Sequence, residues 1–197
     1  MIGLGAKGYG IAKSCLAAGH ETFGFDVVPD HMARFQADGG AQGDLAASAG
    51  DLDAIAGVVL NAELTVTVLF GLDGVVPKLL KDAVGLAHAT VPPDFARMME
   101  ARCAEHRVHY LDAPISGGAL KAAQGQLSVM ASGRAEAFEA AAPVLAATAE
   151  TVFRLGDSAG AGSAMKAVNQ LLAGVHIATM AEALTFGMTQ GVQPDQF

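Results

Sequence analysis

The chain has 197 residues, of which 52% are hydrophobic and 16% are charged, so it can bury a core of ordinary size. Its formal net charge of -8 argues against a nucleic-acid partner, because phosphate contacts need clustered Lys and Arg. Cys15 and Cys103 are far apart and indicate neither a disulfide framework nor a zinc site. No signal peptide precedes the first glycines, so a reducing cytoplasm is the expected location.

The N-terminal residues contain the pattern GxGxxG, formed by Gly3, Gly5 and Gly8. In a dinucleotide-binding fold, the first glycine makes a tight turn, the second lets the backbone approach the pyrophosphate, and the third packs a helix on a strand. A helix is expected over 9–18, and the free N–H groups and dipole at its N-terminus would hold the phosphates. Only two residues precede the glycines, so either the numbering starts inside the natural chain or the first strand is a stub.

A strand-like run over 22–26 ends in Asp26, which lies 18 residues after Gly8. This is close to the spacing of the carboxylate that binds the adenosine ribose hydroxyls of a dinucleotide. An acid at this position would repel the 2′-phosphate of NADP, so NAD is the favoured cofactor. The alternative is that Asp26 is only a turn residue before Val27.

Strands and helices are expected to alternate through the rest of the chain, which predicts an α/β fold with a doubly wound sheet. Ligands bind at the carboxyl ends of such strands. Leu60, Asn61 and Thr90 are therefore candidate cofactor contacts, with a loop cap as the alternative role for Asn61. The expected strands cover 55–60, 84–89, 109–112, 127–131 and 151–155, and the expected helices cover 29–37, 64–70, 75–80, 95–106, 135–147 and about 163–190.

The sequence DAPISGG over 112–118 forms a glycine-rich connection from a strand to a helix. Ser116, Gly117 and Gly118 offer a hydroxyl and backbone N–H groups, a combination that suits a carboxylate or phosphate. An ordinary glycine-rich turn is the alternative.

Lys166 and Asn169 share one face of the last predicted helix, and Gln170 flanks it. A lysine at such a polar site could act as a general acid/base, although a lysine snorkelling from a helix N-terminus is the alternative. The helix is apolar on most sides, so a partner chain or a further domain is expected to cover it. His176 and Glu182 argue against a membrane span.

These motifs, in this order, resemble the 3-hydroxyisobutyrate dehydrogenase-like family, the β-hydroxyacid dehydrogenases. The resemblance implies an NAD-binding Rossmann domain over 1–162, then over 163–197 a long interdomain helix and the start of an all-helical domain whose remainder is missing. It also implies a homodimer or homotetramer, and a second active-site lysine from the missing domain. One departure is Lys7, where the family usually has Met. The matching segments are 3–8, 112–118, 160–162, and Lys166 with Asn169.

By resemblance, Lys166 would be the catalytic acid/base, and no metal is implied. To work near neutral pH, Lys166 needs a pKa that burial depresses below its free value of about 10.4, and the positive nicotinamide ring would act in the same direction. Ser116, Gly117 and Gly118 would bind the substrate carboxylate, and Asn169 would orient the substrate. The implied NAD contacts are Gly3, Leu4, Gly5, Gly8, Asp26, Leu60, Asn61 and Thr90.

Within the family, residues 112–133 and 169–182 look most like the L-threonate dehydrogenases. The expected function is therefore NAD-dependent oxidation of an L-threonate-like hydroxy acid. 3-Hydroxyisobutyrate and 2-hydroxy-3-oxopropionate (tartronate semialdehyde) are alternative substrates, and a non-catalytic dinucleotide-binding module is an alternative function. The retained Lys166 argues against that module and against an imine reductase-like enzyme. The lack of a basic cluster argues against a phosphogluconate dehydrogenase.

Overall fold

The strands form two three-stranded sheets in a computed structural model that describes residues 1–196. The first sheet is parallel with the order β1-β2-β3, and it comprises β1 (Ala54–Gly57), β2 (Val84–Ala87) and β3 (His109–Asp112). In the second sheet, β5 pairs antiparallel with β4 and parallel with β6; its strands are β4 (Ile115–Ser116), β5 (Leu127–Ala131) and β6 (Ala149–Arg154).

The N-terminal segment extends the first sheet through isolated bridges. Ile2 pairs in parallel with both Phe25 and Gly57, and its N–H donates to the Ala56 carbonyl at 2.8 Å. The first strand is thus present only as bridges at Ile2. The predicted strand over 22–26 is reduced to bridges at Phe23 and Phe25.

Most predicted helices are present: α1 (Ala6–Ala17), α2 (Pro29–Ala37), α4 (Ala62–Phe70), α5 (Pro93–Glu105), α7 (Ala135–Thr148) and α8 (Ala161–Thr189). The structure adds the short helices α3 (Leu45–Ser48) and α6 (Gly118–Ala123), and the 3-10 turns η1 (Ala49–Asp51), η2 (Val76–Lys78) and η3 (Pro194–Gln196).

The prediction of a helix over 75–80 is wrong, because only the single turn η2 forms there. Pro77 lies in the first turn, where proline is tolerated, but Leu79 is already extended, so no second turn forms. The strands predicted over 55–60 and 84–89 are also too long. They end at Gly57 and Ala87, and the residues beyond them form loops.

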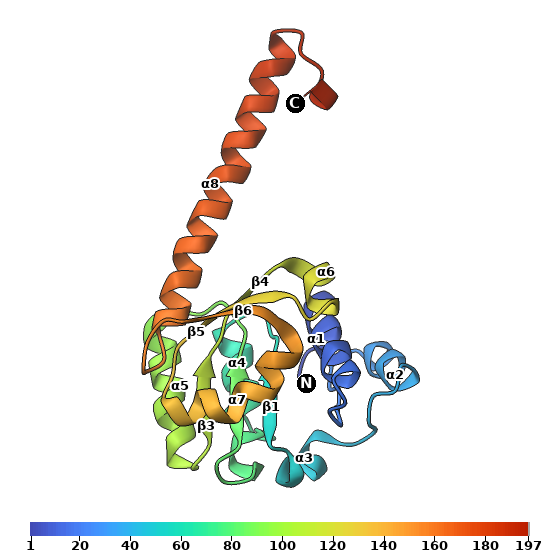
Figure 1. The fold of residues 1–197 in the computed structure, drawn as a ribbon, viewed down its shortest axis with the longest axis vertical. Coiled ribbons are helices and arrows are strands. Elements are labelled where there is room, and N and C mark those ends of the chain that lie inside the picture. The colour runs from blue at the N-terminus through green and yellow to red at the C-terminus, as the bar shows by residue number, and fades with distance from the viewer. Residues whose placement is uncertain (197) are drawn as a thin grey trace.

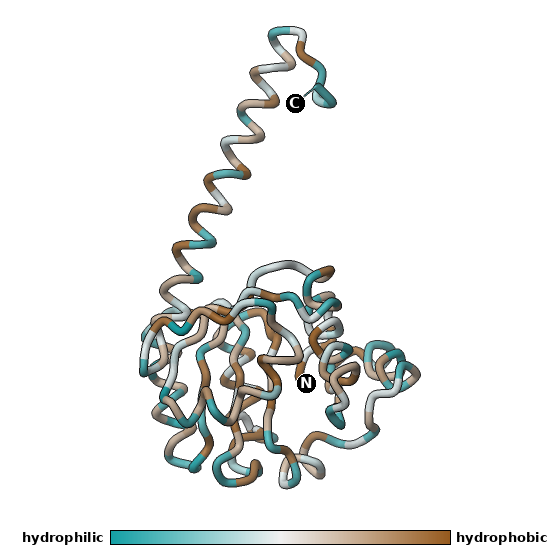
Figure 2. The backbone as a smooth tube through the Cα atoms, viewed as in Figure 1, coloured by the Kyte–Doolittle hydropathy of each residue, from teal (hydrophilic) through white to brown (hydrophobic). Residues whose placement is uncertain are grey.

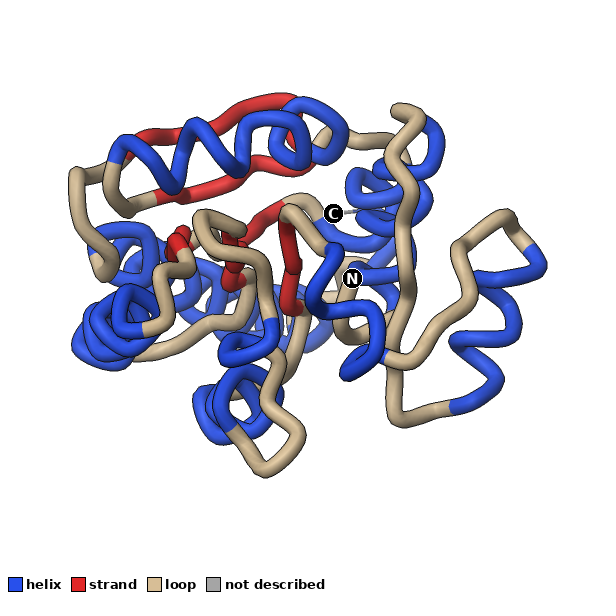
Figure 3. Tube along the Cα trace, turned by 90° about the horizontal axis from the view of Figure 1, so that it is seen from below, coloured by secondary structure: helices blue, strands red, loops and turns tan. Residues whose placement is uncertain are grey.

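Helices cover both faces of the first sheet, as Figure 3 shows from below. Side chains alternate between the faces of a strand. Ile55 and Tyr110 therefore join the apolar cluster of α4 and α5, whereas the neighbouring Ala56 and Leu111 join the cluster of α1 and α7. A parallel sheet buried on both sides is the doubly wound arrangement expected from the sequence, with its ligand-binding edge at the carboxyl ends of the strands.

Helix α8 leaves this body and projects away from it (Figure 1). Gly162, Ser163 and Lys166 at its beginning are buried, whereas most side chains from 167 to 189 are exposed. Hydrophobic residues recur along the projecting part (Figure 2). Residues 1–196 therefore leave most of this apolar helix uncovered, in line with the expectation that a partner chain or a further domain covers it. What covers it stays a prediction.

The length and composition of α8 would allow it to cross a membrane. His176 and Glu182 therefore do not exclude a membrane span by themselves. The core helix of a soluble protein satisfies the same criterion.

Candidate functional site

The glycine loop is tightly packed at Gly3 and Gly8 and open at Gly5. Gly3 has φ +86°, and a Cβ there would lie 2.4 Å from the Val58 carbonyl oxygen. A Cβ at Gly8 would lie 1.9 Å from the Gly3 carbonyl oxygen. By contrast, a Cβ at Gly5, the N-cap of α1, would meet no atom within 4 Å. The open position at a helix N-terminus is where a pyrophosphate can approach the backbone.

Asp26 is bound directly to this loop. Its Oδ2 accepts the Leu4 N–H at 2.6 Å and its Oδ1 accepts the Val28 N–H at 2.9 Å. His31 Nδ1 lies 3.3 Å from Oδ2. Burial acts to raise the pKa of Asp26, but the two N–H groups and His31 together hold that pKa below its ordinary value. The structure thus keeps an ionised carboxylate beside the glycine loop, and the Val28 bond shows that Asp26 also stabilises the turn.

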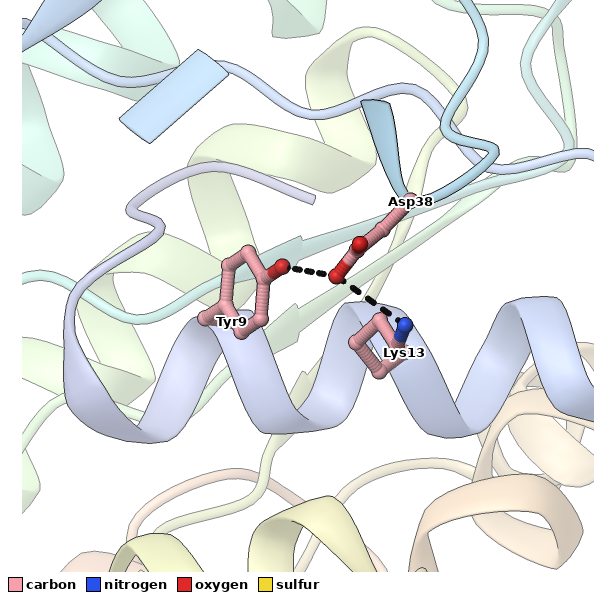
Figure 4. Close-up of polar contacts among 3 residues, drawn as sticks. All are labelled: Tyr9, Lys13 and Asp38. Carbon is pink, nitrogen blue, oxygen red and sulfur yellow. Dashed lines mark hydrogen bonds and ion pairs between the residues drawn. The ribbon is translucent and has the colours of Figure 1, made fainter. Parts of the chain in front are cut away.

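Exposed polar contacts join α1 to the end of α2 (Figure 4). The Tyr9 hydroxyl and the Lys13 ammonium both donate to Asp38 Oδ2, the latter at 3.0 Å. The Arg34 guanidinium lies 3.9 Å from the centre of the Tyr9 ring. Each exposed contact contributes little free energy. Together they fix α1, which carries the glycine loop, against the helix that follows Asp26.

A groove of about 370 Å³ opens at the carboxyl ends of β1 and β2. Segments that are far apart in the sequence converge on it, as expected at this edge of a doubly wound sheet. Of the predicted site residues, five line it: Gly5, Gly8, Leu60, Thr90 and Lys166. The remaining lining residues are Ala6, Lys7, Val58, Val59, His88, Ala89, Ile115 and Gln170.

Lys166 points into the body of the protein and does not snorkel into solvent. It is 7% exposed, and its Nζ donates to the Ile115 carbonyl at 2.8 Å. Asn169 Oδ1 is a more distant acceptor at 3.4 Å. Burial lowers the pKa of Lys166, and the positive charge of Lys7 lowers it further. A lysine with these properties can exchange a proton with a ligand in the groove.

Ser116, Gly117 and Gly118 lie beside Lys166 without lining the groove itself. Ser116 belongs to β4 and pairs with Ser128, directly after the carbonyl that binds Lys166. Gly117 and Gly118 have φ of +134° and +74° and are exposed. The glycines are thus required by the backbone conformation, and their N–H groups lie in an accessible loop near the lysine.

Asn61 and Asn169 have local partners. Asn61 is the N-cap of α4, and its Oδ1 accepts the Leu64 N–H at 2.9 Å. This is the loop-cap role left open by the sequence, and Asn61 does not line the groove. Asn169 is half-buried and contacts Lys166. Gly3 and Leu4 do not line the groove either; Gly3 shapes the loop, and Leu4 is buried below it.

His88 lines the groove and was not predicted from the sequence. Its Nδ1 lies 2.6 Å from the Ala113 carbonyl oxygen, so Nδ1 carries the proton, and Nε2 is buried without a partner among residues 1–196. Burial lowers the pKa of His88, although the bond to Ala113 opposes this. The available signal was its position two residues before Thr90, at the same strand end.

Within residues 1–196, no three His, Cys, Asp or Glu side chains cluster in a way that could hold a metal ion. The features that are present are a glycine loop leading into a helix, a carboxylate bound to that loop, and a groove at the strand ends. They define a dinucleotide-binding domain of the Rossmann type.

Comparison with known families agrees with this class. Residues 1–156 match the family described as the NAD binding domain of 6-phosphogluconate dehydrogenase. Residues 160–197 match the family described as the NAD-binding domain of NADP-dependent 3-hydroxyisobutyrate dehydrogenase. The chain belongs to the 3-hydroxyisobutyrate dehydrogenase-like family, and its cofactor class is a nicotinamide dinucleotide.

Individual relatives support the same placement. The chain is 46% identical to an L-threonate dehydrogenase from Cupriavidus necator over 99% of its own length and 66% of the relative's. It is 43% identical to an L-threonate dehydrogenase from Pectobacterium atrosepticum, over 99% of its own length and 65% of the relative's. A crystal structure of 3-hydroxyisobutyrate dehydrogenase from Salmonella typhimurium superposes with a TM-score of 0.92 at 42% identity, over 97% of this chain and 67% of that one. The chain thus spans about two thirds of the length of these relatives.

Proposed function

We propose that this chain is the cofactor-binding part of an NAD-dependent dehydrogenase that oxidises the hydroxyl of a small hydroxy acid, with Lys166 as general acid/base. The observation that carries the proposal is the buried Lys166, whose lowered pKa and position on the groove wall suit proton exchange. The dehydrogenase names of the relatives support the reaction class.

The open Gly5 position and the N-terminus of α1 would hold the pyrophosphate of the dinucleotide. When bound, the nicotinamide supplies the hydride acceptor. Lys166, as the neutral amine, takes the hydroxyl proton of the substrate while the carbon loses hydride. In the reverse direction, its ammonium returns a proton to the oxygen. The Ile115 carbonyl and Asn169 fix the direction of Nζ.

The substrate carboxylate is proposed to bind the backbone N–H groups and hydroxyl of Ser116, Gly117 and Gly118. This loop follows Ile115 directly, so an anion there would lie close to Lys166. Asn169 would contact the substrate hydroxyl region from α8. The loop is exposed, which leaves it accessible to a ligand.

NAD is proposed over NADP. The ionised carboxylate of Asp26 suits the two ribose hydroxyls as an acceptor, and it would repel a 2′-phosphate. The remaining proposed NAD contacts are Gly3, Leu4, Gly8, Leu60, Asn61 and Thr90.

L-Threonate is the proposed substrate, in line with the names of two relatives at 46% and 43% identity. 3-Hydroxyisobutyrate is the main alternative, because the Salmonella typhimurium structure bears that name at 42% identity. 2-Hydroxy-3-oxopropionate is a third candidate. The apolar face of α8 supports a homodimer or homotetramer, and a cytoplasmic location is proposed with it.

The test is NADH formation with L-threonate and, separately, with 3-hydroxyisobutyrate, by wild type and by Lys166→Met. The variant should lose about 10²- to 10⁴-fold in turnover, with its Kd for NAD within about twofold of wild type because Lys166 does not bind the pyrophosphate. Lys78→Met, on the exposed turn η2, is the matched control and should match wild type. Equal losses of turnover and NAD affinity in Lys166→Met would refute the catalytic role. NAD binding without turnover on any of these acids would point either to the non-catalytic module or to a requirement for the all-helical domain that the family resemblance implies.

A further inference from the structure

Asp112 lies where both sheets and helix α8 meet. It is the last residue of β3 and is fully buried. Its backbone forms an antiparallel bridge with Ser132, which follows β5: Asp112 N–H donates to the Ser132 carbonyl at 3.0 Å, and Ser132 N–H returns a bond at 2.8 Å. This bridge joins the parallel sheet to the second sheet.

The side chain of Asp112 caps α8 from outside the helix. The N-cap Gly160 has no side chain with which to bind the free N–H groups of the first turn. Asp112 Oδ2 accepts the N–H groups of Gly160 at 2.9 Å and Ser163 at 2.8 Å, and Oδ1 accepts the Ser163 hydroxyl at 2.7 Å. Ser132 Oγ donates to Asp112 Oδ2 at 3.1 Å and accepts the Gly162 N–H at 2.9 Å.

We propose that Asp112, together with Ser132 and Ser163, is a positioning group that fixes the place of Lys166 relative to the groove. Lys166 lies one helical turn after Ser163, and its Nζ binds the carbonyl of Ile115, three residues after Asp112. The Asp112 carboxylate thus binds the helix that carries Lys166, and the loop of the candidate substrate site begins a few residues after Asp112. The inference rests on the proposed role of Lys166.

The packing around the first turn leaves little room for α8 to move. A Cβ at Gly162 would lie 2.3 Å from the Met130 carbonyl oxygen and 2.9 Å from that of Asp112. The helix backbone therefore touches the ends of β3 and β5 directly. Loosening the cap would let the turn shift away from the strands, and a shift of about 1 Å at a reacting group can cost about 100-fold in rate.

Single hydroxyl deletions test the proposal with little risk to folding. Ser163→Ala removes the hydroxyl bond to Asp112 and keeps the bond from the Ser163 N–H. Ser132→Ala removes the hydroxyl bond to Asp112 and the bond from the Gly162 N–H. Thr148→Ala is the matched control: Thr148 is also buried, donates to the Val144 carbonyl at 2.7 Å, and precedes β6 at the end opposite Ser132. Asp112→Asn is a stronger change that can prevent folding, so the serine variants decide the outcome.

The first readout needs no turnover. Acetic anhydride labelling of the 197-residue chain, followed at Lys166 by mass spectrometry across a pH series, reports the protonation of that amine. Lys7 and His88 line the groove wall that faces Lys166, and both are unchanged in these variants. Ser163→Ala and Ser132→Ala should move the labelling midpoint upward, whereas Thr148→Ala should leave it unchanged. The second readout is turnover, which should fall about tenfold in the serine variants, with Kd for NAD within about twofold of wild type.

A purely structural role predicts something different. If Ser163→Ala and Thr148→Ala lower thermal stability alike and neither moves the labelling midpoint or turnover, the positioning proposal is wrong. If wild type turns over no hydroxy acid but Ser163→Ala still shifts the midpoint, the positioning of Lys166 stands independently of the reaction. If wild type is active, Lys166→Met is inactive and the serine variants match Thr148→Ala, only the positioning fails.

Discussion

Lys7 and Lys166 line the same groove from opposite ends of the sequence, and the charge of Lys7 opposes protonation of Lys166. Lys7 lies between the glycines of the loop. It is exposed, so its effect is smaller than that of the burial of Lys166. Lys7 thus lowers the pKa of the proposed catalytic group.

Lys7→Met should raise the pKa of Lys166, because one of the two causes that lower it is removed. The oxidation step requires the neutral amine, so the rising limb of turnover against pH should move to higher pH. Turnover at neutral pH should fall while the plateau at high pH is kept. Added salt should reduce the difference between wild type and variant, because charges facing solvent are screened.

The control for this change is Lys13→Met, which removes a lysine from the same helix. Lys13 is paired with Asp38 at 3.0 Å, and it is not among the groups that shift Lys166. Its pH profile should match wild type. A midpoint that stays fixed or falls in Lys7→Met would contradict the electrostatic role of Lys7.

Two alanine substitutions in the glycine loop should separate folding from cofactor binding. Gly8→Ala would place a Cβ 1.9 Å from the Gly3 carbonyl oxygen, so it should destabilise the protein by about 2–3 kcal/mol. Gly5→Ala meets no atom within 4 Å and should fold normally. Its methyl group would instead occupy the approach of the pyrophosphate, so NAD affinity should fall at least about tenfold. Thermal melts and NAD titrations measure the two effects, and full NAD affinity in Gly5→Ala would place the pyrophosphate elsewhere.

The parts of the site that follow from local rules were predictable from the sequence. The glycine spacing identified the loop, and the rule that ligands bind at strand ends identified Leu60 and Thr90, which line the groove. The helical spacing placed Lys166 and Asn169 on one face, and the two side chains are in contact. Each of these inferences needs only neighbouring residues or one sheet-edge argument.

The parts that depend on long-range packing were not predictable. Asp112 contacts Ser163 across 51 residues, and nothing in the local sequence pairs them. The direction of Lys166, inward to Ile115, also depends on a contact across 51 residues. Local signals failed where two roles fit one residue, since Asn61 is a cap of α4. They also failed over 75–80, where the apolar pattern favoured a helix and only the turn η2 forms.

Asp26→Asn should weaken NAD binding and the preference for NAD over NADP. The neutral amide loses charge-assisted bonds to the ribose hydroxyls, so NAD affinity should fall about tenfold or more. The repulsion of a 2′-phosphate should also decrease, so the ratio of the two Kd values should move toward one. Asp30→Asn, an exposed change in the first turn of α2, should alter neither value. If the ratio is the same in Asp26→Asn as in wild type, Asp26 does not select the cofactor.

His88 should make the protein less stable as the pH falls from about 7 to 5. Burial lowers its pKa in the folded state below the ordinary value of about 6.5. Below that value the unfolded chain binds a proton that the folded chain does not, so acid favours unfolding. One proton of difference is worth about 1.4 kcal/mol per pH unit. The loss begins near the unfolded-state pKa and stops once the folded histidine is also protonated.

His88→Asn should remove this pH dependence. The Asn amide can still donate to the Ala113 carbonyl in place of Nδ1, so the variant should fold, and it has no proton to gain. Urea unfolding between pH 5 and 7 should give a flatter dependence of the free energy of unfolding on pH than in wild type. His176→Asn, on the exposed part of α8, should keep the wild-type slope. An equally steep slope in His88→Asn would assign the acid sensitivity to another group, and His88 would then be protonated in the folded protein as readily as in the unfolded chain.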